Sequence, residues 1–181
     1  MKTKVLLFAA LTLVVGLTSC QKIQDSLTVT VPVDFTVDLN VEESTPDLKM
    51  GGIPFRASET LDPNKNEDYM EYKEKIKSIT PKLITFTFKN LPQSITLHEA
   101  VLDIATDVNN SINFYLPLET TVSNSQSFTW AITQAQIDKL KGFFDSGQPI
   151  MVDWIGTASE NISYELSVLI KTDVKASIFG E

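Results

Sequence analysis

The longest regular pattern in the chain is an alternation of apolar and polar residues that begins at Leu27. From Leu27 to Val41 the odd-numbered residues are apolar, and most of the residues between them are polar. A period of two is typical of a β-strand with one buried face. Pro32 lies on the polar side and has no N–H to donate, which indicates an edge strand or a break where the strand changes sheet.

A second long alternation occupies positions 162–178. Its even-numbered residues are apolar or neutral and its odd-numbered residues are mostly polar, with Leu169 as the exception. Shorter strand candidates lie between the two long ones, at 53–58, 83–89, 94–105, 112–116, 127–132 and 149–157. Many short strands separated by turns predict an antiparallel β-sandwich, either immunoglobulin-like or barrel-like.

Two segments interrupt the strand pattern with helical spacing. In the segment 62–79, apolar residues recur at helical intervals, namely Tyr69, Tyr72, Ile76 and Ile79. In the segment 133–147, Thr133 and Gln136 form a capping box and Gly147 is placed to end a helix. The sequence therefore predicts a mainly β fold with two short helices.

The N-terminus has the layout of a secretory signal peptide. Lys2 and Lys4 precede an apolar run at 5–17, which is followed by small residues and then Cys20. The run is too short for a membrane-spanning helix, which needs about 20 apolar residues. We therefore expect a signal peptide at 1–19, an anchor and short linker at 20–26, and a single β-sandwich domain at 27–181.

The sequence Leu17-Thr18-Ser19-Cys20 resembles the lipobox of bacterial lipoproteins. The resemblance implies that the Cys20 sulfur receives a diacylglycerol, that the chain is cut just before Cys20, and that the new amino group is usually acylated. Two or three acyl chains anchor a protein stably to a membrane, whereas a single chain is marginal. The alternative is an ordinary signal peptide in which the cysteine has no role.

Residues after Cys20 bear on the membrane to which the protein is sorted. No acid follows Cys20 directly, which by analogy with enterobacterial sorting argues against retention in the inner membrane. Lys22 matches surface-exposed lipoproteins of the Bacteroidota, but Ile23 and Gln24 stand where those proteins carry acids. We expect lipid anchoring in the outer membrane, with the periplasmic face favoured over the cell surface.

Two further segments resemble proteins of the Bacteroidota. Asp25-Ser26-Leu27 is similar to the three-residue O-glycosylation sequon of that phylum, which makes Ser26 a possible O-glycosylation site. The helix-to-strand sequence "DYMEYKEKIKSI" leading into "LITFTFKN" resembles uncharacterised lipoproteins of the same phylum. This second resemblance implies no activity and no site residues.

Charge and cysteine content exclude several classes of function. The chain of 181 residues has a formal net charge of −8, and loss of Lys2 and Lys4 with the signal peptide lowers it to −10. An acidic domain is a poor partner for nucleic acid or for anionic lipid head groups, so we expect no nucleic-acid binding. Because Cys20 is the only cysteine, a disulfide within the domain, thiol catalysis and a cysteine-based metal site are excluded.

His98 is the only histidine and the only residue on which a Ser-His-Asp triad could be built. A slip in the alternation predicts a β-bulge near His98 and Glu99, and bulges can re-aim side chains at active sites. No nucleophile elbow accompanies the residue. We interpret it as an ordinary edge or surface histidine, and we assign no catalytic residue and no cofactor.

A weak calcium signal lies at Asp62, Asn64 and Asn66, which match the first half of a calcium-binding loop. The second half does not match, because Glu67 replaces the turn glycine and Lys73 stands at the position of the bidentate glutamate. Asp and Asn at the start of a helix are also common capping residues. We therefore assign no metal site and keep these three residues as weak candidates.

Aromatic residues offer one further possibility, a platform for sugar binding. Trp130 shares its strand face with Phe128, and Trp154 shares its face with Val152, so both tryptophans are predicted to lie in the core. Tyr115 lies off the apolar face of its strand and is predicted to be exposed.

These observations favour a non-enzymatic function. We expect a lipid-anchored lipoprotein of the cell envelope whose β domain has a binding or structural accessory role. Its partners would be the membrane, through the N-terminal acyl chains, and a protein or glycan of unknown identity. The alternatives are a carrier of an apolar ligand held between the sheets and a hydrolase that uses only carboxylates, such as a glycosidase pair.

Overall fold

The computed structural model describes residues 27–42, 52–107, 109–160 and 163–178. Cys20 and Ser26, the predicted lipidation and glycosylation sites, lie outside the described residues.

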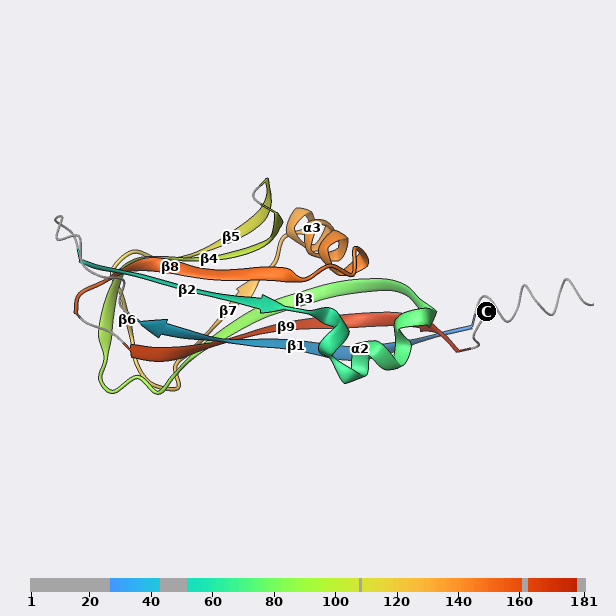
Figure 1. Ribbon diagram of the computed structural model, residues 1–181, viewed down its shortest axis with the longest axis horizontal. Coiled ribbons are helices and arrows are strands. Elements are labelled where there is room, and N and C mark those ends of the chain that lie inside the picture. The colour runs from blue at the N-terminus through green and yellow to red at the C-terminus, as the bar shows by residue number, and fades with distance from the viewer. Residues whose placement is uncertain (1–26, 43–51, 108, 161–162, 179–181) are drawn as a thin grey trace, which may run out of the picture.

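The described residues form two antiparallel sheets that pack face to face (Figure 1). Sheet A has the strand order β1-β9-β3-β7, and sheet B has the order β2-β8-β4-β5 with β6 beside β4. The strands are β1 (Thr28–Glu42), β2 (Ile53–Leu61), β3 (Ile76–Lys89), β4 (Ile95–Asp107), β5 (Asn110–Leu116), β6 (Thr120–Val122), β7 (Ser127–Ala131), β8 (Ile150–Ala158) and β9 (Ser163–Ser177). The predicted antiparallel β-sandwich with two short helices is confirmed.

The two long alternating segments of the sequence pair with each other in sheet A. β1 and β9 are antiparallel neighbours over 15 residues each, from Thr28 opposite Ser177 to Glu42 opposite Ser163. β9 also pairs with β3 and is therefore internal, whereas β1 is an edge strand. Pro32 is exposed on β1, so its predicted edge position is confirmed.

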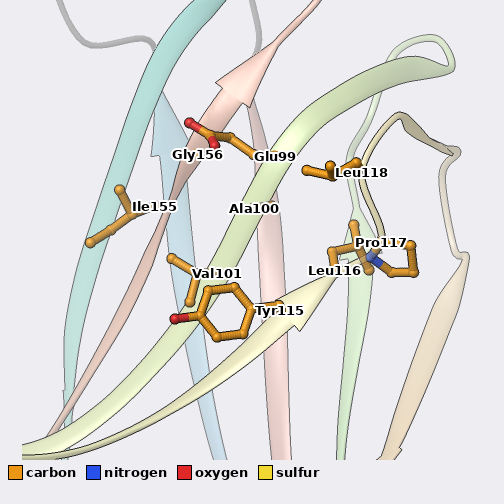
Figure 2. A pocket seen from close by; sticks show the side chains of 9 residues that line it. All are labelled: Glu99, Ala100, Val101, Tyr115, Leu116, Pro117, Leu118, Ile155 and Gly156. Atoms are coloured by element: carbon orange, nitrogen blue, oxygen red, sulfur yellow. The ribbon is translucent and has the colours of Figure 1, made fainter.

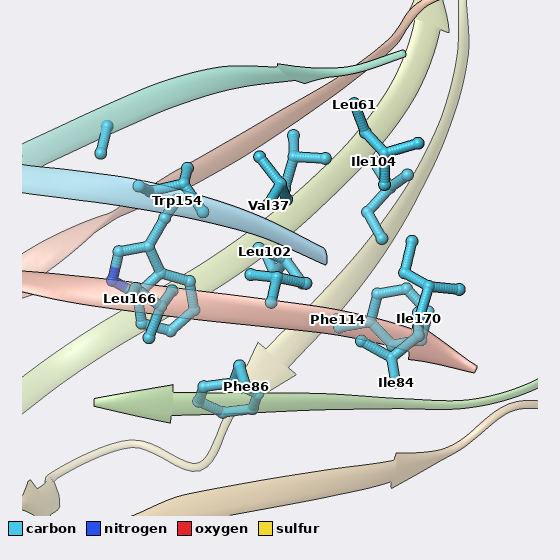
Figure 3. Close-up of a cluster of buried hydrophobic side chains, with 14 of the residues drawn as sticks. Val37, Leu61, Ile84, Phe86, Leu102, Ile104, Phe114, Trp154, Leu166 and Ile170 are labelled. Carbon is cyan, nitrogen blue, oxygen red and sulfur yellow. The ribbon is translucent and has the colours of Figure 1, made fainter. Parts of the chain in front are cut away.

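Large aromatic side chains fill the space between the sheets (Figure 3). The Phe86 ring on β3 stacks on Trp130 of β7, with ring centroids 4.2 Å apart. Trp154 on β8 is completely buried, and its indole N–H donates to the hydroxyl of Tyr164 on β9 at 2.8 Å. This hydrogen bond joins the two sheets. Trp154 lies in the core as predicted, and Trp130 is a half-buried residue packed against the core.

The helix predicted at 62–79 is wrong in its second half. The segment forms a 3₁₀ turn η1 (Pro63–Lys65), a short helix α2 (Glu67–Tyr72) and a second 3₁₀ turn η2 (Lys73–Lys75), and strand β3 begins at Ile76. The apolar pair Ile76 and Ile79 fits helical spacing, but both residues instead pair with β9. Pairing with β9 therefore outweighs the local helical pattern. Pro81, five residues after Ile76, would also disfavour a longer helix.

The second helix, α3 (Gln134–Asp145), agrees with its prediction, including the capping box between Thr133 and Gln136. Its buried residues are Leu140, Phe143 and Phe144. The Phe144 ring lies 4.6 Å from that of Phe35 on β1, measured between centroids. Helix α3 therefore completes the core at one end of the sandwich rather than covering an outer sheet face.

Sheet A continues past sheet B at the end of the molecule where β1 begins and β9 ends (Figure 1). Leu27, Val29 and Ile178 continue the apolar alternation there, yet their relative exposures are 44%, 39% and 52%. The prediction that the whole apolar face of both long strands is buried is therefore wrong at this end. The cause is that sheet A extends beyond the described strands of sheet B at this end (Figure 1).

A candidate binding face on sheet B

The strand register of sheet B lines up its outward-facing residues in rows across the sheet. One row consists of Arg56, Ile155, Val101 and Tyr115, from β2, β8, β4 and β5. The adjacent row consists of Ser58, Asp153, Asp103 and Asn113, from the same strands. The first row is largely apolar and the second is polar.

An apolar hollow of about 540 Å³ lies on the outer face of sheet B, over the first of these rows. Its lining residues are Glu99, Ala100, Val101, Tyr115, Leu116, Pro117, Leu118, Ile155 and Gly156 (Figure 2). Tyr115 and Leu118 are the most exposed large apolar side chains among the described residues, at 69% and 74%. Glu99 contributes a carboxylate to the lining. The hollow can therefore hold an apolar group and places a negative charge beside it.

A bulge in β4 shapes the edge of this hollow. The register between β4 and β8 shifts between Leu97 and Glu99, so the predicted bulge at His98 and Glu99 is present. The His98 side chain is half-buried, and its Nδ1 lies 3.0 Å from both carboxylate oxygens of Glu119. His98 thus forms an ion pair with the turn before β6 when its ring is protonated, in agreement with its interpretation as a surface histidine.

Asp103 and Asp153 stand directly opposite each other in the polar row. Direct antiparallel partners place their Cβ atoms about 4.5–5.5 Å apart, and like charges in this arrangement destabilise a sheet. Arg56 Nη2 donates to Asp153 Oδ2 at 2.9 Å. The Oδ1 atoms of both aspartates are shielded from solvent and have no hydrogen-bond partner among the described residues.

The sequence could not indicate this carboxylate pair, because fifty residues separate its members and only the register between β4 and β8 brings them together. Retaining glycosidases also use two neighbouring carboxylates. However, Asp153 is almost completely buried and forms an ion pair with Arg56. The hollow lies over the neighbouring row of residues, not over this pair.

The calcium candidates are occupied by capping interactions. Asp62 Oδ1 accepts from the Asn64 backbone N–H at 3.0 Å, and Asn66 Oδ1 accepts from the Tyr69 backbone N–H at 2.8 Å. Asn64 Oδ1 accepts from the Lys73 ammonium at 2.8 Å, which places a positive charge where a cation would bind. Within the part of the chain that the structure describes, no group of three or more His, Cys, Asp or Glu residues is arranged to hold a metal ion.

Sequence reasoning identified one main residue of the hollow. Tyr115 is exposed as predicted. Leu118 was missed because it lies in the connection between β5 and β6, where no periodic pattern exists. Val101 and Ile155 were missed as neighbours because their pairing depends on the register.

Comparisons with known proteins leave the family open. No protein-family model matches the chain, and no curated protein matches it. Among the residues with described structure, no helix is both long enough and apolar enough to cross a bilayer.

Several solved structures of viral proteins are similar in part. The decameric BFDV capsid protein has 7% identity and a TM-score of 0.45, with coverage of 82% of this chain and 99% of that chain. The Desmodium yellow mottle tymovirus structure has 9% identity and a TM-score of 0.33, with coverage of 84% and 91%. The infectious bursal disease virus Gx strain has 12% identity and a TM-score of 0.29, with coverage of 85% and 38%. At these scores the similarities carry no function to this chain, and the fold assignment rests on its own strand pairing.

Proposed function

We propose that this protein is a lipid-anchored lipoprotein of the cell envelope whose β-sandwich is a non-catalytic binding module. The anchor is Cys20, and the binding face is the outer face of sheet B around the apolar hollow. The observation that carries the proposal is the hollow itself, where Tyr115 and Leu118 remain strongly exposed. Exposed apolar patches on soluble domains commonly mark interaction sites.

The lining of the hollow favours a protein partner over a glycan. Val101, Ile155 and Leu118 are aliphatic, and Tyr115 supplies the only aromatic ring in the lining. Such a surface accommodates an apolar side chain of a partner, whereas a sugar needs flat aromatic faces and several hydrogen-bonding groups. Glu99 in the lining and the acidic net charge favour a partner with basic residues next to the apolar group.

The alternative of an apolar-ligand carrier has less support. A carrier would need open space between the sheets, but that region is packed with large side chains such as Trp154, Phe86 and Phe88. The apolar hollow instead lies on an outer sheet face and is open to solvent.

Metabolic labelling with palmitate in the native bacterium tests the anchor. We expect the wild-type chain to incorporate label and Cys20→Ala to incorporate none, because the lipobox chemistry requires the cysteine sulfur. Ser19→Ala, which keeps a small residue before Cys20, is the matched control and should retain the label. Incorporation into Cys20→Ala would show that the anchor proposal is wrong.

Capture of partners from the native envelope tests the binding face. The double variant Tyr115→Ala, Leu118→Ser should recover at least about tenfold less of any protein that the wild type captures, which corresponds to a loss of about 1.4 kcal/mol in binding. Met70→Ala removes another exposed apolar residue, on α2 and outside the hollow, and should capture the same proteins as the wild type. Equal capture by the double variant would exclude the sheet B face.

A further inference from the structure

We propose that the exposed end of sheet A rests on the lipid surface to which the chain is anchored. This end is defined by Leu27, Val29 and Ile178, and we call it the apolar tip. The inference rests on the proposed anchor at Cys20, and it adds the orientation of the domain relative to the membrane.

The apolar tip is a continuous surface rather than three scattered residues. The Ile178 backbone N–H donates to the Leu27 carbonyl at 3.1 Å, which holds the two ends of the described chain together. Val29 is the register partner of Ala176 on β9, and Ala176 in turn pairs with the half-buried Ile76 of β3. Val29, Ala176 and Ile76 therefore form a row across sheet A that contains no polar residue. The apolar face of the sheet continues through this row from the core to the exposed tip.

The length of the preceding chain limits how far the apolar tip can lie from the membrane. Leu27 follows Cys20 by seven residues. Even when fully extended, seven residues span at most about 25 Å. Strand β1, with 15 residues, is about 50 Å long. The short tether therefore keeps the apolar tip near the lipid, while the far end of β1 can lie well away from it.

Lysines around the apolar tip suit the head-group region of a phospholipid layer. Lys175 is exposed on β9 beside the tip and is the register partner of both Thr30 and Ser78. Lys77 is exposed at the start of β3. Long lysine side chains can lie along an apolar contact and place their ammonium groups among the lipid phosphates.

The experiment uses the acylated full-length product reconstituted into vesicles of phosphatidylethanolamine and phosphatidylglycerol. Because Cys20 is the only cysteine and would carry the lipid, Ile178→Cys and Leu118→Cys each introduce a single free thiol. Both native residues are strongly exposed, so neither substitution disturbs the core. Each thiol is labelled with the fluorophore bimane, and quenching by lipids with brominated acyl chains is measured.

We expect quenching at position 178 to be several-fold stronger than at position 118, which lies on the outer face of sheet B. Adding Val29→Ser to the Ile178→Cys protein should reduce the quenching, because it weakens the apolar contact. Equal quenching at the two positions would overturn the inference while leaving the anchor intact. Labelling of Cys20 by bimane in the wild-type protein would instead show that the Cys20 sulfur carries no lipid. The anchor proposal and this inference would then both be wrong.

Discussion

At the scale of single residues, the pairing of Asp103 with Asp153 works against the stability of sheet B. Their carboxylates face each other across β4 and β8, and one oxygen of each is buried without a hydrogen-bond partner. Arg56 compensates the charge of Asp153 but makes no hydrogen bond to Asp103. The structure thus contains a local like-charge repulsion that a single substitution can relieve.

Asp103→Asn should therefore stabilise the protein by about 0.2–1 kcal/mol at neutral pH, since it removes the repulsion and leaves the Arg56–Asp153 pair in place. Urea unfolding followed by circular dichroism measures the change. Glu59→Gln removes one negative charge from an exposed position of the same sheet and serves as the control for net charge. A gain in Glu59→Gln as large as that in Asp103→Asn would attribute the effect to net charge alone.

Tyr164 gives the stability a predictable pH dependence. Burial raises the pKa of its hydroxyl above the ordinary value of 10.0, and the Trp154 hydrogen bond opposes that rise only in part. The native state therefore holds the proton more tightly than the unfolded chain. Its contribution to stability is fully present below about pH 10 and is lost as the pH rises through the raised native pKa.

Tyr164→Phe should lower the free energy of unfolding by about 1–3 kcal/mol at pH 7, because it leaves the buried Trp154 N–H without an acceptor. It should also make the alkaline loss of stability shallower than in the wild type, because one ionisation is removed. Urea midpoints at pH 7 and above pH 10 provide both readings. An unchanged alkaline slope would mean that Tyr164 does not titrate with unfolding.

At the scale of the secondary-structure elements, β9 is the strand on which sheet A depends. It lies between β1 and β3, and Leu166 and Ile170 on its inner face are completely buried. Leu169, on the other face, is half-buried and pairs with Thr36 and Thr85. The one-sided alternation in the sequence is therefore matched by one-sided burial.

Leu166→Ala and Ile170→Ala should each destabilise the protein by about 2–5 kcal/mol, from the lost transfer energy and the cavity left behind. Lys171→Ala, one residue over on the exposed face, should change stability by less than about 0.5 kcal/mol. Urea midpoints distinguish the two outcomes. Comparable losses for Ile170→Ala and Lys171→Ala would contradict the burial pattern of β9.

The elements that could be predicted are those whose local pattern agrees with their final environment. The strands β1 and β9 carry a long period of two with few exceptions, and α3 carries its own capping box, so the local sequence indicates these elements. The segment 62–79 is predicted wrongly because Ile76 and Ile79, three residues apart, fit a helix but not an unbroken period of two. A register shift between Ile76 and Ser78 lets both pair with the inner face of β9, which lies about a hundred residues away in the chain.

The candidate site could be predicted less well than the fold, for the same physical reason. Exposure of Tyr115 follows from its parity on one strand. The hollow beside it requires Val101 and Ile155 from two other strands in a register that includes a bulge. Side chains that meet only through pairing of distant strands leave no signal in a single sequence.

At the scale of the whole molecule, β1 and β9, which lie near the two ends of the described chain, pair with each other in sheet A. Among the described strands, β1 has β9 as its only hydrogen-bonded neighbour in sheet A, and β9 also joins it to β3. Folds dominated by such distant pairings form slowly, on a timescale of about milliseconds to seconds for small domains. Sheet A cannot be completed until the last strand is available.

Truncation after Ala158 should therefore abolish folding, because it removes β9 and leaves β1 and β3 without their shared neighbour. Loss of cooperative urea unfolding and of dispersed amide signals in NMR spectra would show this. Truncation after Ile178 keeps all of β9 and should retain cooperative unfolding. A folded product from the shorter chain would mean that β1 and β3 pair directly.

The antiparallel pairing of β1 and β9 also has a mechanical consequence. If the chain is tethered through its N-terminus, a force pulling the domain away from the membrane acts along the axis of β1, starting at Thr28. The hydrogen bonds between β1 and β9 run across that axis over all 15 paired residues. They are then strained together in shear rather than opened one after another. The tethered domain should therefore resist unfolding under such an axial pull far better than under a force applied across β1, which would break the same bonds one after another.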